Sequence, residues 1–379
     1  MKKLALTIFF DSFALMLLGL IIVMSASSTY SVFKFDSVFY LFNSHLFKVG
    51  FGIVLVIAFS FIPYEIYRSL SKPAVIATLI LLIITLLYAP NVKGAGRWLD
   101  LGFMSIQPAY IAMFALVIHI ASLLEDKTNL VDNYRHGFLY LFIWIMLFAG
   151  LIMLQPNISS GIMIIIISLT VVYVGGGRLK HIFISMFASG ILAGSVAMIF
   201  SHSRSRIISF VESIFNGGDL NFQVKQALYS LGSGGMFGVG IGNSMQSNLF
   251  LPEAYGDFIF AILGEETGLI GALLVLLSYL ILFTAGILIA KNATDKFGQL
   301  LAFGITLTIT LYAFVNVAVT TGIFPTTGLP LPFISYGGTF LIFVCISVGI
   351  LINIAFTQHL RQKSNIDVDV NNKSDGNVE

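Results

Sequence analysis

The chain has 379 residues, of which 57% are hydrophobic and only 10% are charged, and its formal net charge is +2 at pH 7. This composition is too apolar for a water-soluble domain of this length and is typical of a membrane protein. A nucleic-acid-binding surface would need a basic cluster, which is absent here, and the single cysteine, Cys345, excludes a disulfide framework or a thiolate metal site.

Ten apolar segments are long enough to cross about 30 Å of hydrocarbon. In chain order they cover residues 4–26, 46–63, 73–90, 106–124, 138–155, 158–174, 181–200, 257–290, 298–320 and 333–357. The first segment has no cleavage site followed by a soluble domain, so we expect a retained helix rather than a signal peptide. We predict an all-α polytopic membrane protein with ten transmembrane helices in residues 1–361 and a polar, disordered tail in residues 362–379.

The distribution of basic residues predicts the orientation. If the N-terminus is cytoplasmic, the inner segments carry thirteen of the twenty Lys and Arg residues. This excess fits the positive-inside rule with both termini and the tail in the cytoplasm. We therefore expect a multi-pass membrane protein whose two termini lie on the same, cytoplasmic side.

Two external loops are longer than the other connections. The first covers residues 88–105, and the second covers residues 201–256 between the seventh and eighth spans. Loops of the second length are usually functional or disordered. Because this one has aromatic and aliphatic residues at helical spacing, we expect an ordered segment with short helices on the membrane surface.

The second loop contains the glycine-rich stretch "LGSGGMFGVGIGNS", residues 231–244. It lacks the preceding strand of a dinucleotide site and the Gly-Lys-Ser/Thr of a phosphate-binding loop. One interpretation is that the glycines serve positive φ angles or close backbone approach. The other is that its amides, with Arg204, Arg206 and Lys225, face an anionic headgroup at the outer leaflet.

The eighth span opens with "LPEAYGDFIFAILGEETGLIG", residues 251–271, which holds four acidic side chains. Carboxylates inside a membrane are usually paired, turned to water, or functional. We expect a helix from Pro252 with Glu253 and Asp257 on one face. Below Asp257 lies a stripe of small residues, Ala261, Gly264, Gly268 and Gly271, which serves either close helix packing or a groove for a lipid tail. Glu265 and Glu266 are expected to pair within the bundle and not to be catalytic.

Three further features lie near the external side. Arg97 and Trp98 are either an interfacial anchor pair or a substrate contact. Gln107 and Pro108 open the fourth span, where a proline loses no helical hydrogen bond. The stretch "GIFPTTGLPLPFISYGG", residues 322–338, holds three prolines, so it cannot be a regular helix and must be buried in protein or line a cavity.

From about residue 8 to residue 357 the sequence resembles the SEDS family (shape, elongation, division and sporulation), which includes FtsW and RodA. The resemblance is carried by "QALYSLGSGGMFGVGIGNSMQSNLFLPEAYGDFIFAILGEETGLIG" and "NVAVTTGIFPTTGLPLPFISYGGTFLIFVCISVGILIN". It implies ten transmembrane helices and polymerisation of lipid II into peptidoglycan glycan strands, in complex with a class B penicillin-binding transpeptidase and other division proteins. It also implies that Asp257 is the catalytic residue. The candidate substrate-binding residues are Arg97, Trp98, Gln107, Arg204, Arg206, Lys225, Ser244, Gln246, Glu253 and Ser335.

The chain departs from the family pattern at several polar positions. The usual glutamate and lysine after "QP" are Tyr110 and Met113, and Asn157 replaces an aspartate. Gly256 stands in the motif that precedes Asp257, and Ser247 replaces a lysine. These changes bear on substrate contacts and turnover more than on the fold.

Two function classes compete. The first is an inverting glycosyltransferase, which needs one base and cations for the leaving pyrophosphate; no cofactor is predicted, and an assisting divalent cation is left open. The second is a lipid II flippase, for which broken helices and intramembrane carboxylates are also typical. Polar groups cluster on the outer side, which favours the enzyme over the flippase or a scaffold without chemistry. Within the family, "GIGNSMQSNLFLPE" and "SVGILIN" favour the septal FtsW role over the elongation role of RodA.

Overall fold

The computed structural model describes residues 1–90, 96–100, 102, 105–126, 134–215, 218, 220–248 and 250–375. In this part of the chain nearly all regular structure is helical, apart from one short hairpin in which Leu99 pairs with Ile106 and Asp100 with Ser105. The elements in chain order are α1 Lys2–Phe35, α2 Tyr40–Phe61, α3 Glu65–Tyr88, β1 Leu99–Asp100, β2 Ser105–Ile106, α4 Pro108–Asp126, η2 Tyr134–Phe138, α5 Leu139–Leu154, α6 Ile158–Val174, α7 Leu179–Ile199, α8 Ser201–Phe215, α9 Phe222–Gly234, α10 Ile259–Asn292, α11 Lys296–Thr320 and α12 Thr339–Asp375.

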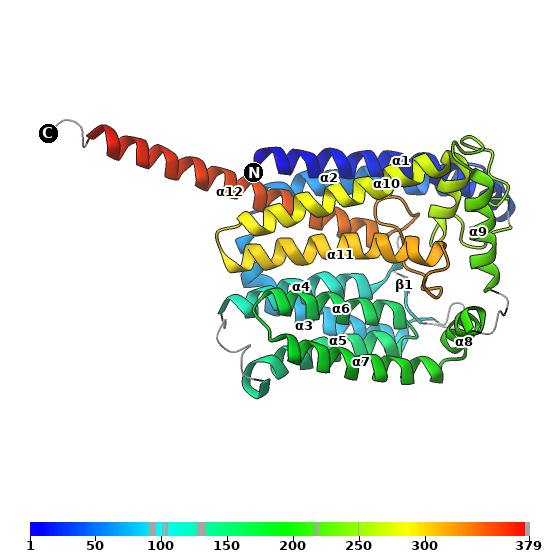
Figure 1. Cartoon of the computed structure of the whole chain (residues 1–379), viewed down its shortest axis with the longest axis horizontal. Coiled ribbons are helices and arrows are strands. Elements are labelled where there is room, and N and C mark those ends of the chain that lie inside the picture. Colours follow the sequence, from blue (N-terminus) through cyan, green and yellow to red (C-terminus); the bar gives the residue numbers. More distant parts are fainter. Residues whose placement is uncertain are drawn as a thin grey trace.

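The long helices lie side by side along the long axis of the molecule (Figure 1). Eight described helices are long and apolar enough to cross a membrane, and the shorter apolar helices α5 and α6 stand where the fifth and sixth spans are predicted. The all-helical polytopic fold is therefore confirmed, and the exact count of ten spans stays a prediction. The last helix begins at Thr339 instead of residue 333, because Phe333, at φ 67°, interrupts helical geometry.

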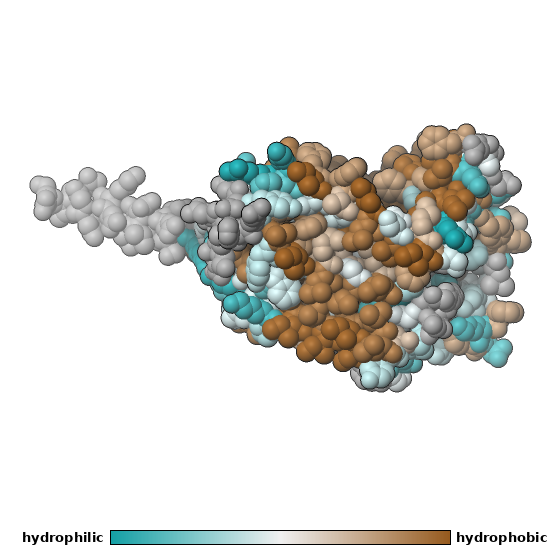
Figure 2. All heavy atoms as spheres, turned by 90° about the horizontal axis from the view of Figure 1, so that it is seen from below, coloured by the Kyte–Doolittle hydropathy of each residue, from teal (hydrophilic) through white to brown (hydrophobic). Residues whose placement is uncertain are grey.

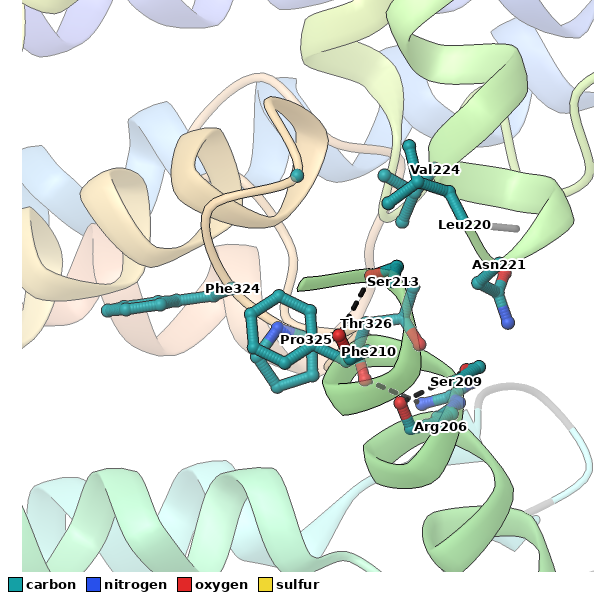
Figure 3. A pocket seen from close by; sticks show the side chains of 11 residues that line it. Arg206, Ser209, Phe210, Ser213, Leu220, Asn221, Val224, Phe324, Pro325 and Thr326 are labelled. Carbon is teal, nitrogen blue, oxygen red and sulfur yellow. Dashed lines mark hydrogen bonds between the residues drawn. The ribbon is translucent and has the colours of Figure 1, made fainter. Parts of the chain in front are cut away.

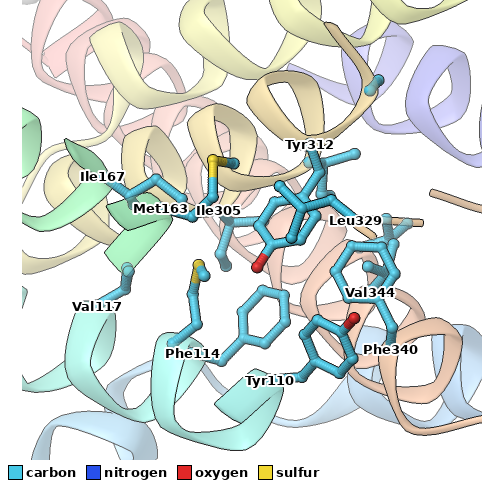
Figure 4. Packing of buried hydrophobic residues seen from close by; sticks show 14 of the residues in the cluster. Tyr110, Phe114, Val117, Met163, Ile167, Ile305, Tyr312, Leu329, Phe340 and Val344 are labelled. Atoms are coloured by element: carbon cyan, nitrogen blue, oxygen red, sulfur yellow. The ribbon is translucent and has the colours of Figure 1, made fainter. Parts of the chain in front are cut away.

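The centre of the bundle is formed by α4, α11 and α12. In their most apolar stretches 83%, 67% and 78% of the residues are buried, against 22% in α2 and 28% in α3 and α7. Figure 4 shows the packing at this centre, where side chains of α4, α6, α11 and α12 interdigitate. The peripheral helices expose aliphatic and aromatic side chains instead, and hydrophobic residues form a broad area on the face seen in Figure 2. Such an outward apolar face suits contact with lipid.

The described part of the second loop is ordered, as predicted, and contains α8 and α9 at the end of the bundle opposite the two chain termini (Figure 1). The helix α10 is broken at Gly268, whose backbone is non-helical at φ 69° and ψ −171°. The loop that follows α9, residues 235–240, inserts into this break. Val239 and Gly240 donate N–H groups to the carbonyls of Glu265 and Glu266, while Leu269 and Ile270 donate to Gly235 and Met236. The inserted loop thus satisfies the backbone groups that the break would leave unpaired.

Two glycines permit this insertion. A Cβ atom on Gly268 would lie 2.4 Å from the Gly238 nitrogen, and one on Gly238 would lie 2.1 Å from the Glu266 carbonyl oxygen. Both residues also have positive φ angles, 69° and 80°. Within the glycine-rich stretch, Gly235, Gly240 and Gly242 have positive φ angles as well. Positive φ and close backbone approach therefore explain these glycines, which confirms the first interpretation of the stretch.

The C-terminal end differs from the sequence expectation. The backbone continues α12 as a helix to Asp375, which projects away from the bundle (Figure 1), and residues 376–379 lie outside the described residues. A short helical segment that projects alone from a bundle is only marginally stable in water. The disordered tail at residues 362–379 therefore stays a prediction.

Candidate functional site

Asp257 lies in a turn that directly precedes α10, at the end of the bundle that carries α8 and α9. The prediction that a helix starts at Pro252 is wrong, since α10 begins at Ile259. Glu253 has a φ of 58°, which no helix accommodates, and its carbonyl accepts the N–H groups of Gly256 at 3.0 Å and Phe258 at 3.3 Å. Glu253 and Asp257 therefore do not share a helix face. The turn instead presents Asp257 ahead of the helix.

Hydrogen bonds from α11 and from the segment before α12 hold this turn. Asn316, on α11, donates from Nδ2 to the Asp257 carbonyl oxygen at 2.7 Å and to the Leu329 carbonyl at 2.8 Å. The buried Ser335 donates from Oγ to the Gly256 carbonyl at 2.8 Å, and the Tyr336 amide donates to the Tyr255 carbonyl at 2.9 Å. Three consecutive carbonyls are thus held by the core. Asn316 was not singled out from the sequence, although an Asn inside an apolar helix is a signal that could have found it.

Two arginines from separate segments lie in the electrostatic field of Asp257. Burial lowers the pKa of Arg97, and repulsion from Arg206 adds to this effect, whereas the Asp257 carboxylate opposes it. Burial likewise lowers the pKa of Arg206, again opposed by Asp257. Arginine remains protonated in proteins even so. The site therefore combines one carboxylate with two partly desolvated guanidinium groups.

Main-chain contacts position both arginines. Arg97, between α3 and β1, donates from a terminal nitrogen to the Pro156 carbonyl. Arg206 donates to the Thr326 carbonyl at 3.4 Å and borders a small pocket between α8, the start of α9 and residues 322–326. Figure 3 shows Phe210, Ser213, Phe324 and Pro325 around this pocket. The predicted proline-rich segment therefore lines a cavity beside Arg206.

The stripe of small residues on α10 is covered by protein. Ser230 on α9 donates from Oγ to the Ala261 carbonyl at 3.1 Å. A Cβ on Gly264 would lie 2.5 Å from Leu231 Cδ2. Helix packing through small residues accounts for this face. The alternative prediction, a groove for a lipid tail along the stripe, is wrong, because α9 and the inserted loop occupy that position.

Glu265 and Glu266 hold the inserted loop in place. The Glu265 carboxylate accepts from Ser230 Oγ at 2.7 Å, Ser244 Oγ at 2.6 Å and the Met245 amide at 3.1 Å. Glu266 accepts from Ser25 on α1 and from the Gly242 amide at 3.0 Å. Their structural role is confirmed, with hydroxyl and amide partners in these contacts. Ser244 belongs to this network, so the structure does not bring it to Asp257.

The other predicted site residues are spread over the external end. Gln107 is buried where α4 begins, and its backbone N–H donates to Thr339 Oγ1 at 3.0 Å. Trp98 and Arg204 are exposed, which suits interfacial contacts more than a buried subsite. Lys225 is half-buried on α9. Gln246 is also half-buried, and its backbone carbonyl accepts a hydrogen bond from the Leu251 backbone N–H. Among the candidates, Glu253 lies within the Asp257 turn itself. The described contacts and charges also connect Arg97, Arg206 and Ser335 to Asp257 or to its turn.

The departures from the family pattern are mostly absorbed by packing. Tyr110 and Met113 are buried on α4, and the Tyr110 ring lies 4.7 Å from the Phe340 ring and 6.3 Å from the Tyr312 ring (Figure 4). Asn157 is buried and Ser247 caps Ser244 through hydrogen bonds of 2.9 and 3.1 Å. The Gly256 carbonyl accepts a hydrogen bond from Ser335 Oγ within the turn. On α4, buried Tyr110 and Met113 therefore stand where the family pattern has a glutamate and a lysine.

Comparisons with known proteins agree with this architecture. A family model described as "Cell cycle protein" (FTSW_RODA_SPOVE) matches residues 5–360. A "Probable peptidoglycan glycosyltransferase FtsW" from Coxiella burnetii is 34% identical over 351 residues, which cover 90% of this chain and 94% of that protein. "Stage V sporulation protein E" from Bacillus subtilis is 34% identical over 346 residues and covers the same shares.

Solved structures share the fold. A chain described under "Structural coordination of polymerization and crosslinking by a peptidoglycan synthase complex" has a TM-score of 0.74 at 22% identity, over 93% of this chain and 97% of that one. The rod shape determining protein RodA of Thermus thermophilus has a TM-score of 0.68 at 23% identity, over 93% and 96% of the two chains. The fold of this chain is thus shared with these two solved proteins.

Proposed function

The chain belongs to the FtsW, RodA and SpoVE family of cell cycle proteins, and from this premise we propose that it is a peptidoglycan glycosyltransferase. Its substrate would be lipid II, an undecaprenyl-diphosphate-linked disaccharide peptide, polymerised into glycan strands at the outer side of the membrane. The proposal agrees with the name of the 34% identical relative from Coxiella burnetii.

The observation that carries the proposal is the electrostatic influence of Asp257 on both Arg97 and Arg206. These residues come from three separate segments, yet their charges interact in a partly buried site. Acceptance of a proton and stabilisation of a leaving diphosphate need opposite charges close together. In a partly dehydrated site such charges act more strongly than in water.

In the proposed reaction the 4-hydroxyl oxygen of one GlcNAc attacks the anomeric carbon of a second lipid-linked disaccharide. A glycosidic C–O bond forms as the bond from the anomeric carbon to the diphosphate oxygen breaks, with inversion. Asp257 accepts the hydroxyl proton as general base. Undecaprenyl diphosphate leaves with the bonding electron pair, and Arg97 and Arg206 stabilise its charge, as guanidinium groups do for phosphates.

The cellular role is proposed to be septal wall synthesis, with RodA-like elongation as the alternative. Relatives named FtsW support the septal role. Depletion would then give long, unseptated cells. Rounded cells that still divide would transfer the assignment to elongation.

The partner is proposed to be a class B penicillin-binding transpeptidase in the cytoplasmic (inner) membrane, with both termini of this chain inside. The solved structural neighbour described as a peptidoglycan synthase complex supports an assembly of polymerising and crosslinking activities. Because apolar helices gain no hydrophobic drive from association in lipid, we expect small-residue or polar contacts between the partners.

The experiment is polymerisation of fluorescent lipid II by the purified chain, with and without its transpeptidase. Glycan strands are expected, and EDTA in a parallel reaction tests the divalent cation that the sequence left open. Transfer of lipid II across proteoliposome membranes without polymerisation would instead support the flippase. Absence of both transfer and polymerisation would support a scaffold without chemistry.

A further inference from the structure

Tyr279 connects α10 to the proline-rich segment between α11 and α12. Its side chain is fully buried, and its hydroxyl donates a hydrogen bond to the Pro332 carbonyl. A buried tyrosine hydroxyl usually has such a partner. Beyond Pro332 the same segment donates hydrogen bonds to the Asp257 turn. The contact therefore joins a transmembrane helix to the segment that supports the candidate base.

The residue after Pro332 has a strained backbone. Phe333 has a φ of 67° and is almost completely buried. A bulky residue rarely adopts positive φ, and such a conformation persists only where the surrounding structure holds it. Strained residues of this kind gather at functional sites. The contacts on either side of Phe333 therefore bear on how the segment reaches the Asp257 turn.

Two helices hold the strained residue from opposite neighbours in the chain. On α10, Tyr279 binds the carbonyl directly before Phe333. On α1, Gly19 lies so close to the segment that a Cβ there would be 2.7 Å from the Phe333 carbonyl oxygen and 2.8 Å from the Ile334 Cα. Since these are backbone atoms, the segment cannot move toward α1. Only the hydrogen bond from Tyr279 restrains Pro332 among the contacts described for its carbonyl.

Ser335 transmits the position of this segment to the Asp257 turn. The Leu331 amide donates to Ser335 Oγ at 2.7 Å, and the Ser335 amide donates to the Leu331 carbonyl at 3.0 Å. These two bonds close a turn around Pro332 and Phe333. The same Ser335 Oγ donates to the Gly256 carbonyl at 2.8 Å. A shift of Pro332 would therefore displace the residue that directly precedes Asp257.

We propose that Tyr279 is a positioning residue for Asp257 and acts through Pro332 and Ser335. This inference rests on the proposed function, in which Asp257 is the general base. Removal of the hydroxyl leaves the buried Pro332 carbonyl without its donor, and the closed turn relaxes with Ser335. Proton transfer requires hydrogen-bond distance between base and hydroxyl, so a small displacement of Asp257 slows the chemical step.

The kinetic test compares Tyr279→Phe with Tyr64→Phe. Both substitutions remove one hydroxyl from a fully buried tyrosine. The Tyr64 hydroxyl donates to Asp295, which follows the last residue of α10, whereas the Asp257 turn precedes the first one. The control thus has the same chemical change at the other end of the bundle.

Both variants are assayed for lipid II polymerisation with the transpeptidase present, below the unfolding temperature of each protein. Tyr279→Phe should lower kcat about tenfold and leave KM within about twofold, whereas Tyr64→Phe should keep the kcat of the unmodified protein. An unchanged kcat for Tyr279→Phe would refute the positioning role. An equal fall in both variants would also refute it, since loss of stability alone would then explain the result.

Amide hydrogen exchange measured by mass spectrometry separates this role from the proposed function. In Tyr279→Phe, peptides covering residues 253–258 and 331–336 should exchange about tenfold faster, the effect of one lost hydrogen bond, with no change there in Tyr64→Phe. If exchange rises in both segments although the unmodified protein does not polymerise lipid II, the function fails and the positioning of the turn stands. If the unmodified protein polymerises lipid II and Tyr279→Phe leaves exchange in residues 253–258 unchanged, the positioning role fails and the function stands.

Discussion

Substitution of Gly268 by alanine tests the loop insertion that shapes the external end. The added Cβ would lie 2.4 Å from the Gly238 nitrogen and 2.5 Å from the Met236 carbonyl oxygen. Because both are backbone atoms, no rotamer change can relieve the contact. Gly268 also occupies a region of φ and ψ that is nearly restricted to glycine, where another residue costs about 1–3 kcal/mol.

Withdrawal of the loop would remove further stability. Four backbone hydrogen bonds join residues 235–240 to α10 at the break, and each contributes about 0.5–1.5 kcal/mol. Strain and lost bonds together predict a destabilisation of at least about 3 kcal/mol. Such a change is large among single substitutions.

Cys345 provides the assay, since it is the only cysteine and is fully buried. A thiol-reactive dye in detergent reports its exposure on heating, and Gly268→Ala should unfold at a clearly lower temperature. Gly190→Ala is the matched control, because nothing lies within 4 Å of a Cβ at that exposed helical position. Unfolding of Gly268→Ala within about 1 °C of the unmodified protein would show that the loop insertion is not tight.

Three further predictions concern the turn, the loop and the topology. Asn316→Leu removes the hydrogen bonds to the Asp257 and Leu329 carbonyls. Because Asp257 would then shift from its position, kcat for lipid II polymerisation should fall about tenfold or more, with KM little changed. An unaltered kcat would show that Asn316 does not position Asp257. Glu265→Gln weakens the acceptor of three hydrogen bonds and should lower the free energy of unfolding by about 1–3 kcal/mol. Cys345 labelling on heating measures this change, and unfolding like that of the unmodified protein would contradict a stabilising role of the network. Reporter fusions within residues 212–225 and after Arg361 should report exterior and cytoplasm respectively, and the reverse pattern would overturn the orientation.

The sequence predicted the helices well because membrane spans are set mainly by hydrophobic length. Apolar segments such as residues 158–174 became helices with the same bounds. Less was predicted around Pro252 and Gly268, where local pattern suggested a continuous helix. The positive φ of Glu253 and the entry of residues 235–240 depend on tertiary hydrogen bonds. No periodicity in one segment reveals such contacts.

The site was predicted in part for the same reason. Resemblance to the family singled out Asp257, and both Arg97 and Arg206 interact with its charge. Ser244, by contrast, was a reasonable candidate by its position in a motif, yet it binds the Glu265 carboxylate. Asn316 and Asp257 are separated by 59 residues in sequence. Their contact appears only when α11 packs against the turn before α10.

The most direct test of the account is the Asp257→Asn protein in the lipid II polymerisation assay. Asparagine keeps the shape of the side chain but cannot accept the hydroxyl proton. The variant should lose glycan synthesis by at least about a hundredfold, while expression and recovery of the transpeptidase stay unchanged. Glu212→Gln, the same chemical change at an exposed position on α8, should retain full activity. Polymerisation by Asp257→Asn at a rate close to that of the unmodified protein would contradict the assignment of Asp257 as the general base.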